Sequence, residues 1–340
     1  MKQEGDKMGS RKLLIAAATA GFTLASLPLQ AAELPGEGVT VSPIKGSPAN
    51  AWFQHMVVQI ALEKLGYEAD ETLEADFPAL HLAVASGDAD YTVNHWRPLH
   101  NGFFDKSGGE DTMSRVKAVI TGAGQGYYID KKTAEAQGIT SIDQLKDPAV
   151  AALFDSDGDG KANLSGCNPG WGCELVIEHH LDSYDLRDSV EHDQGSYFAI
   201  MADTITRYNE GAPILYYTWT PNWISDVLVP GKDVVAIGVP FSSLPNNPDA
   251  DTTLPDGSNP GFAVNDVYIV ANRDFLEDNP AAAKLFALIE IPLSAVNAAQ
   301  VKLRDGEDTP EDFRRHAEDW VAANQATVDA WVAEAAKADQ

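Results

Sequence analysis

The stretch Cys167-Asn-Pro-Gly-Trp171-Gly172-Cys173 places a tryptophan within a turn rich in glycine and proline. Its two ends are the only cysteines of the 340-residue chain. If they pair, they hold the indole in a small rigid frame; the alternative is a structural disulfide beside an incidental aromatic residue. Trp96 and Trp219 also lie beside turn-forming residues, where side chains tend to reach a surface or cleft. Together the three tryptophans favour a functional cleft.

The region before this loop predicts an α/β fold. Strands are expected over residues 39–41, 67–69 and 90–93, with helices over 51–65 and 77–85 between them. A β-α-β-α-β order argues for a parallel sheet with helices on its faces. Ligands of such sheets lie beyond the carboxyl ends of the strands. The strand over 90–93 therefore delivers Trp96 and His100 to a binding edge.

The region after the loop continues this pattern. A helix over 173–181 puts Trp171 and Gly172 at a helix N-terminus, where free backbone amides favour a carboxylate. The other expected elements are strands over 126–129, 214–217, 234–239 and 267–270, and helices starting at Ser141 or spanning 197–208 and 280–289. A final helix starts after Thr309, and its apolar spacing continues to Trp331. Trp320 and Trp331 are therefore expected in the core.

The N-terminus has the pattern of a secretory signal. Basic residues precede an apolar run over residues 13–27, and the small residues Ala31 and Ala32 follow. We expect residues 1–31 to be a signal peptide, cleaved after Ala31. The apolar run is short for a membrane span, and no cysteine stands at the cleavage point to carry a lipid anchor. In an oxidising compartment, two cysteines six positions apart favour a disulfide over a nucleophile or a metal site.

The composition excludes several classes of function. The formal net charge of −27 and the absence of Lys/Arg clusters argue against a nucleic-acid partner. The mature chain contains no G-x-S-x-G, P-loop or G-x-G-x-x-G motif, and we expect no cofactor. His95, His179 and His180 show no metal-ligand spacing, so they are interpreted as structural or exposed.

Three tryptophans on loops can form an aromatic box for a quaternary ammonium group. Each indole face attracts a cation by about 0.5 to 2 kcal/mol. A permanently methylated cation has no N–H to donate, so π faces suit it better than carboxylates. His100 is a candidate partner for a ligand carboxylate. Unrelated tryptophans and a structural histidine remain the alternatives.

A short acidic run matches the first half of a calcium loop. Asp155, Asp157 and Asp159 are followed by Gly160, but the twelfth position is Gly166 and not the usual bidentate glutamate. A solvated acidic turn is favoured over a calcium site.

The chain resembles the periplasmic glycine betaine/proline betaine-binding proteins of ProU-type osmoprotectant ABC importers, across essentially the whole mature sequence. The stretches that carry the resemblance include residues 61–67, Trp96 with 98–100, 124–126, 145–148, 157–161, 166–174, 201–204, 216–221 and 279–287. The cysteine-tryptophan loop within 166–174 is the most specific of them.

The resemblance implies a two-domain periplasmic substrate-binding protein fold of type II, with the ligand in the interdomain cleft. It implies one domain formed by residues 32–124 plus 244–340, and a second formed by 125–243. In this family Trp96, Trp171 and Trp219 would box a trimethylammonium group, while His100 and the amides of Gly172 and Cys173 would hold its carboxylate. Cys167 would pair with Cys173.

The same resemblance implies a periplasmic, non-enzymatic and monomeric component of an ABC importer, without stable membrane insertion. Its partners would be a zwitterionic onium osmolyte and an ABC permease with its cytoplasmic ATPase. Glycine betaine, proline betaine and dimethylsulfoniopropionate are the candidate ligands.

The chain departs from the family pattern around Trp96. Where Asn-Trp-Thr-Pro-Leu-His is expected, it has His95-Trp96-Arg97-Pro98-Leu99-His100. Arg97 either adds a bidentate carboxylate contact or forms a surface ion pair. Two rival functions stay open: an enzyme using Cys173 and His100 as a nucleophile pair, and a binding protein that acts as a ligand sensor.

Overall fold

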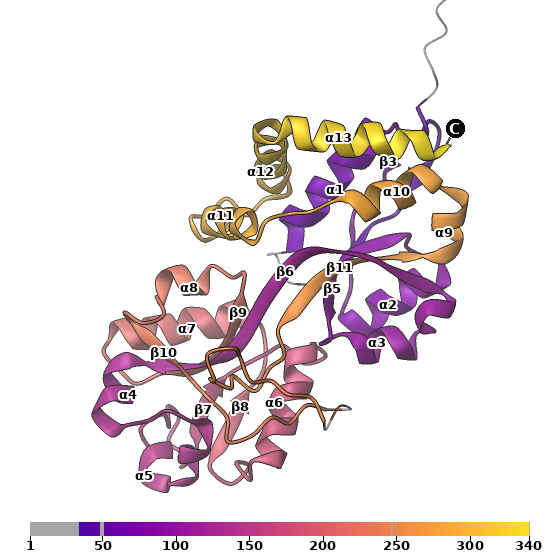
Figure 1. Ribbon diagram of the computed structural model, residues 1–340. Helices are drawn as coiled ribbons and strands as arrows, with labels where there is room; N and C mark the ends of the chain where they lie inside the picture. The colour runs from indigo at the N-terminus through magenta and orange to yellow at the C-terminus, as the bar shows by residue number, and fades with distance from the viewer. Residues whose placement is uncertain (1–33, 48–50, 246, 248, 340) are drawn as a thin grey trace, which may run out of the picture. The chain divides into compact units, whose positions relative to one another are not determined.

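The computed structural model describes residues 34–340 except 48–50, 246, 248 and 340 (Figure 1). The predicted signal peptide, residues 1–31, lies outside the described residues. The strands are β1 Thr40–Val41, β2 Ile44–Lys45, β3 Glu68–Ala69, β4 Leu73–Glu74, β5 Tyr91–Arg97, β6 Met113–Asp130, β7 Ala162–Ser165, β8 Val190–Asp193, β9 Leu215–Thr220, β10 Val234–Ile237 and β11 Asn265–Asn272.

The helices alternate with these strands along much of the chain, and the last five follow β11. They are α1 Trp52–Lys64, α2 Phe77–Ser86, α3 Asn101–Lys106, α4 Lys131–Gln137, α5 Pro148–Ala151, α6 Gly172–Ser183, α7 Tyr197–Asn209, α8 Ile224–Val227, α9 Arg273–Asp278, α10 Pro280–Leu288, α11 Leu293–Arg304, α12 Pro310–Ala323 and α13 Gln325–Ala335. Most of the helices expected from periodicity are present, and their ends agree within one or two residues.

One long strand organises the main sheet. The strand order is β5-β11-β6-β9-β7-β8, with β10 also paired to β6. The N-terminal half of β6 pairs antiparallel with β11 up to Ala123, and the C-terminal half pairs antiparallel with β9 from Gly124 onward. In Figure 1, β6 runs as one continuous ribbon from the elements around β5 and β11 to those around β9 and β7. This strand therefore links the residues on both sides of the site described below.

The prediction of a parallel sheet before the cysteine loop is only partly correct. The pairs β1–β3 and β2–β4 are parallel, but each forms a sheet of two short strands. In contrast, β5 pairs antiparallel with β11, which comes about 170 residues later in the chain. Local periodicity carries no information about such a distant partner. The strand is also longer than predicted and includes Trp96.

The C-terminal helix differs from the prediction as well. Thr309 caps α12 and forms a capping box with Asp312, as expected. The helix ends at Ala323, and α13 begins at Gln325, so the predicted single helix is broken at Asn324. The Asn324 side-chain amide donates to the Trp320 carbonyl, a local bond that competes with the helical ladder. Trp331 is nonetheless buried and stacks against Trp320, which confirms their core role.

The buried side chains form two clusters. One packs α1 and the helices α10 to α13 against β5, β11 and the N-terminal half of β6. The other packs α6 and α7 against β7, β9 and the C-terminal half of β6, and it also includes α2. The change of partner along β6 falls beside the expected boundary between residues 124 and 125. The domain limits themselves stay a prediction.

Among the described residues, no single helix has the length and apolar composition needed to cross a bilayer. The helices α10 and α11 meet that criterion only as a pair bent by 91°.

Candidate functional site

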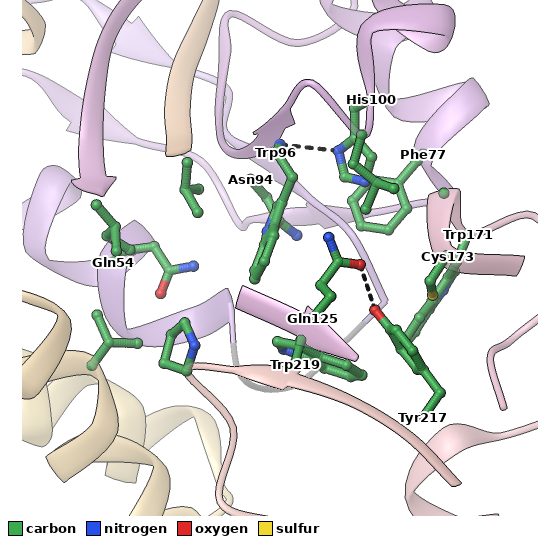
Figure 2. A pocket seen from close by; sticks show the side chains of 16 residues that line it. Gln54, Phe77, Asn94, Trp96, His100, Gln125, Trp171, Cys173, Tyr217 and Trp219 are labelled. Carbon is green, nitrogen blue, oxygen red and sulfur yellow. Dashed lines mark hydrogen bonds between the residues drawn. The ribbon is translucent and has the colours of Figure 1, made fainter. Parts of the chain in front are cut away.

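One cavity brings together the three tryptophans singled out in the sequence (Figure 2). It is lined by Gln54, Phe77, Asn94, Trp96, Leu99, His100, Ile120, Gln125, Trp171, Gly172, Cys173, Tyr217, Trp219, Pro221, Val267 and Val296. All six of the predicted ligand-binding residues are in this set. None of the described lining residues is an aspartate, glutamate, lysine or arginine. A cation here would therefore meet aromatic faces and not carboxylates.

On one side of the cavity, β5 supplies Asn94 and Trp96. Alternate residues of a strand share a face, so both side chains point toward the cavity while His95 points away. The Trp96 indole Nε1–H donates to Asn94 Oδ1 at 3.3 Å. Trp96 lies within the strand and not on a loop, so the loop placement predicted for it is wrong.

The opposite side is an aromatic cluster centred on β9. Tyr217 and Trp219 share the inward face of this strand, and Trp219 is likewise within the strand. The Trp219 ring centroid lies 5.8 Å from that of Trp171, with the ring planes at 75°. It lies 4.5 Å from the centroid of Tyr197. The edge-to-face packing of Trp171 against Trp219 orients the two indoles as adjacent faces of a box.

The cysteine loop forms a rigid entry into α6. Cys167 and Cys173 are joined by a disulfide, as predicted. The loop is further held by His192, whose Nε2 accepts from the Cys167 amide at 3.0 Å. Trp171 is the N-cap of α6 without a side-chain capping bond, so the first amides of the helix, including those of Gly172 and Cys173, point out of its N-terminus. This geometry suits an anion.

His100 faces the start of α6 and is held in one tautomer. Its Nδ1 accepts from the Trp96 backbone N–H at 3.1 Å, so in the neutral ring Nε2 carries the proton. Burial lowers the pKa of His100 well below its usual value, which keeps the ring neutral. A Cβ atom on Gly172 would lie 2.7 Å from Leu99 Cγ and 3.1 Å from His100 Cδ2. Glycine is therefore needed for this close approach.

Three amide side chains of the cavity were not predicted. Gln54, Asn94 and Gln125 are 4%, 3% and 8% exposed. Gln125 lies opposite Trp219 in the antiparallel register and accepts from the Tyr217 hydroxyl at 2.6 Å. Asn94 and Tyr217 could have been predicted from the sequence. Each stands two residues before a predicted tryptophan and so lies on the same face of its strand. Gln125 required the pairing of β6 with β9.

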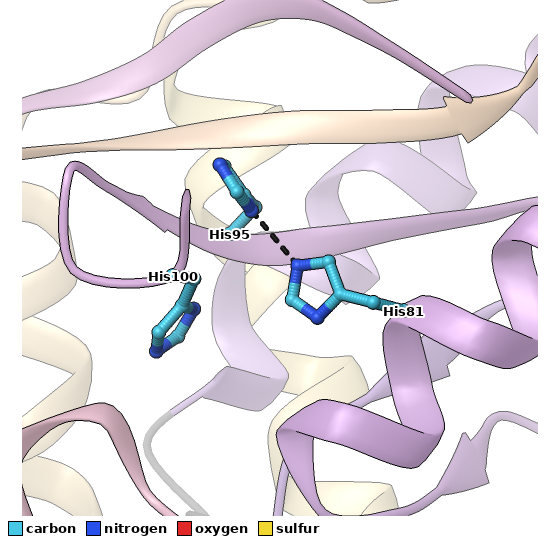
Figure 3. A group of neighbouring side chains, drawn as sticks. All are labelled: His81, His95 and His100. Atoms are coloured by element: carbon cyan, nitrogen blue, oxygen red, sulfur yellow. Dashed lines mark hydrogen bonds between the residues drawn. The ribbon is translucent and has the colours of Figure 1, made fainter. Parts of the chain in front are cut away.

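His100 belongs to a buried group of three histidines, together with His81 and His95 (Figure 3). His81 Nδ1 contacts the Phe77 carbonyl at 2.7 Å, so it carries a proton, and Nε2 accepts from His95 Nδ1 at 2.8 Å. Burial lowers the pKa of His81 to about 4, and burial with the neighbouring histidines and arginines lowers that of His95 well below its usual value.

One nitrogen atom from each of these rings lies within 4.8 Å of the others, a spacing that metal ligands can adopt. However, no carboxylate belongs to the group among the described residues, and Arg97 and Arg115 act on His95. The burial and positive charge that keep protons off these rings also oppose a metal ion. The prediction that His95 and His180 are structural agrees with their burial and hydrogen bonds.

Two weaker candidates lie outside the cavity. Arg97 is exposed and is not among the residues that line the cavity; its guanidinium lies 5.6 Å from the centroid of the Tyr268 ring, and its contact with a ligand carboxylate stays a prediction. Asp155, Asp157 and Asp159 do gather within 4.8 Å, but Asp155 accepts from the amides of Gly158 and Gly160. The preference for an acidic turn over a calcium site stays a prediction.

Comparison with known proteins identifies the family to which the chain belongs. Residues 45–323 match the family model described as the substrate binding domain of ABC-type glycine betaine transport systems. The chain belongs to this family. The glycine betaine/proline betaine-binding periplasmic protein of Escherichia coli is 50% identical over 323 residues, which cover 95% of this chain and 98% of that protein. The glycine betaine-binding periplasmic protein OusX of Dickeya dadantii is 50% identical over 301 residues, covering 88% and 91%.

The fold is that of solved family members. Lactococcal OpuAC in its closed conformation with glycine betaine superimposes with a TM-score of 0.66 at 19% identity, over 86% of this chain and 99% of that protein. The predicted fold class is thereby confirmed. The family consists of transporter binding proteins, so this chain is a periplasmic binding component and not an enzyme. The disulfide also removes the thiol that the enzymatic alternative required.

Proposed function

We propose that this protein captures glycine betaine, or a related onium zwitterion such as proline betaine or dimethylsulfoniopropionate, and delivers it to an ABC permease. The single observation that carries this proposal is the cavity in which three indoles and a helix N-terminus face one space, with no charged side chain among the described lining residues. Membership of the glycine betaine transport family supports the same ligand class.

The cationic head of the ligand lies against Trp96, Trp171 and Trp219. Each face contributes about 0.5 to 2 kcal/mol, with the larger values where water is excluded. Trp171 and Trp219 are 5% and 6% exposed, so their faces are largely shielded from water. A methylated onium group cannot donate hydrogen bonds, and a box of π faces is the binding site that such a group prefers.

The carboxylate of the ligand lies between His100 and the start of α6. His100 Nε2–H donates to it, and the amides of Gly172 and Cys173 provide further donors. Because His100 is neutral, this subsite binds an anion through hydrogen bonds and the helix dipole rather than through a formal charge. The protein then passes its ligand, as a monomer, to a membrane permease driven by a cytoplasmic ATPase.

Calorimetry with the mature protein tests the assignment. Glycine betaine should bind, whereas choline, which has the same cation but no carboxylate, should bind far more weakly. Replacement of any one of the three tryptophans by alanine should lower the affinity about five- to thirtyfold, corresponding to about 1 to 2 kcal/mol. Trp→Phe variants should lose less, because a π face remains.

Trp320→Ala is the control, since this tryptophan packs against Phe53 and Trp331 outside the cavity. It should lower the melting temperature without changing affinity. Choline binding as tightly as glycine betaine, or unchanged affinity in Trp171→Ala, would refute the proposal.

A further inference from the structure

The cavity contains two buried hydrogen-bond donors that the proposed contacts to glycine betaine leave without an acceptor. Asn94 Nδ2 and Gln125 Nε2 are buried and have no hydrogen-bond partner among the described residues. Both side chains line the cavity, and Figure 2 draws them with Trp96 and Tyr217. They come from different strands, β5 and β6, which are separated in the sheet by β11.

The orientation of the Asn94 amide follows from its neighbour. The Trp96 Nε1–H can only donate, so it requires the oxygen of Asn94 and leaves Nδ2 as the free end. In Gln125 the oxygen accepts from the Tyr217 hydroxyl at 2.6 Å, which likewise leaves Nε2 free. Both amides are therefore anchored through their oxygen atoms, and their N–H groups are the ends left without a partner.

Two unpartnered donors in the lining of one cavity require an acceptor. Neither can serve the other, and a buried donor without an acceptor is disfavoured because it has lost its hydration. The methyl groups of an onium head accept nothing. The ligand carboxylate is already matched by His100 and the amides of Gly172 and Cys173. Gln54 Oε1 is an unpartnered acceptor of the same cavity, but it makes no hydrogen bond with either donor. The missing acceptor is thus a third feature of the ligand, or a water molecule.

We propose that this site prefers onium zwitterions that carry a second, uncharged acceptor oxygen, such as a hydroxyl group, in addition to the carboxylate. The inference rests on the proposed function and refines its ligand class. Asn94 and Gln125 are then the residues that determine this preference, because each donates to the additional oxygen. A site built to hydrogen-bond a hydroxyl discriminates against the analogue that lacks it.

Matched ligand pairs test the proposal by calorimetry on the mature protein. Proline betaine and both epimers of 4-hydroxyproline betaine differ by one hydroxyl, as do γ-butyrobetaine and L-carnitine. We expect at least one hydroxylated compound to bind ten times more tightly than its parent. In Asn94→Leu and Gln125→Met, which keep side-chain size but remove the donors, that ratio should fall to about one.

Gln59→Met is the matched control. Gln59 lies in α1, is not among the residues that line the cavity, and donates to Glu63 at 3.2 Å, so the ratio between hydroxylated ligand and parent should not change. Ratios are measured within each variant, so a general loss of cation binding cancels. If a variant does not fold, the ligand pairs on the unaltered protein still decide.

Two results overturn the inference. The first is equal or weaker binding of every hydroxylated compound, with glycine betaine still bound. The second is a crystal structure with glycine betaine that has a water molecule between Asn94 Nδ2 and Gln125 Nε2, combined with no preference for hydroxylated ligands. Failure of all the onium compounds, glycine betaine included, would instead reject the proposed function.

Discussion

The two sides of the cavity are held by different forces. The side formed by β5, α2 and the start of α3 relies on hydrogen bonds between histidines and amides, such as those joining His81 to His95 and His100 to Trp96. The side formed by β9 and α6 relies on ring packing and a covalent bridge. The Trp219 ring packs against the rings of Trp171 and Tyr197, and the bridge is the Cys167–Cys173 disulfide. We call them the polar side and the aromatic side.

This difference separates two tasks. Ring packing and a disulfide hold indoles in place without adding charge, which suits the recognition of a cation by π faces. The polar side must instead present donors in a fixed tautomer, which requires neutral and oriented imidazoles. Protons should therefore act mainly on the polar side, which holds three buried histidines, whereas ring packing makes the aromatic side sensitive to shape.

Acidification should give the largest effect and should act mainly through the polar side. Burial lowers the pKa of His81 on the polar side to about 4, against 6.5 for an unperturbed histidine. It lowers the pKa of His55 to about 4 as well; His55 lies in α1 and accepts from the Val93 amide of β5. Between these values the unfolded chain binds more protons than the folded one, so stability is lost as the pH falls. At pH 5 each such histidine should cost on the order of 1 to 2 kcal/mol of unfolding free energy. Urea denaturation from pH 7.5 to 4.5 measures this loss.

The variant His81→Phe should flatten that pH profile, whereas His179→Asn, on the half-buried surface of α6, should leave its slope nearly unchanged. Equal slopes in all three proteins would contradict the assignment of acid sensitivity to the polar side. His180, which belongs to the aromatic side, also has its pKa lowered to about 4 by burial. A residual slope in His81→Phe is therefore expected.

A methyl group placed between the two sides should have the next largest effect. The Cβ of Gly172→Ala would lie 2.7 Å from Leu99 Cγ, closer than side-chain atoms pack. Overpacking of this kind costs about 1 to 3 kcal/mol, and here it separates His100 from the amides of α6. We expect the affinity for glycine betaine to fall about five- to a hundredfold, measured by calorimetry.

Gly102→Ala provides the comparison. Gly102 lies in α3, two residues after His100, and a Cβ there would meet nothing within 4 Å. This variant should bind normally and be slightly more stable, because alanine favours a helix more than glycine does. If Gly172→Ala also binds normally, then the close approach of the two sides is not needed for binding.

The aromatic side was largely predictable from the sequence, and the polar side was not. The Cys167–Cys173 loop is a contiguous stretch, so its disulfide and the helix start at Trp171 follow from local rules. His95 carried no recognisable spacing, because its partner His81 comes from a separate helix. The role of His95 depends on the packing of α2 against β5, and this packing cannot be predicted from a local sequence pattern.

The sheet shows the same limit. Periodicity located β5 and β9 but misplaced their ends. The strand predicted over 90–93 stops before Asn94, whereas β5 continues to Arg97. The strand predicted over 214–217 stops before Trp219, whereas β9 continues to Thr220. It detected only the last residues of the 18-residue strand β6, whose N-terminal half contains polar and small residues. The antiparallel pairing of β5 with β11 and the position of Gln125 opposite Trp219 are long-range properties, and they decide which side chains line the cavity.

The smallest expected effect concerns the hydrogen bond between Trp171 and Ser47, a residue that follows β2. The Trp171 Nε1–H donates to Ser47 Oγ at 3.2 Å, and both groups are partly buried. Ser47→Ala removes the acceptor and leaves the indole N–H without it, which costs about 0.5 to 1.5 kcal/mol. We expect the affinity for glycine betaine to fall about two- to tenfold, because the ring keeps its contacts with Trp219 and Phe77.

Ser42→Ala is the matched control, since Ser42 precedes the same strand but its hydroxyl donates to Asp70 at the surface. It should bind like the unaltered protein. The size of the loss in Ser47→Ala sharpens the comparison between the two sides. A loss as large as that of Trp171→Ala would mean that a hydrogen bond, and not ring packing, orients this indole. In that case the aromatic side would depend on the same kind of interaction as the polar side, and the division between them would not hold.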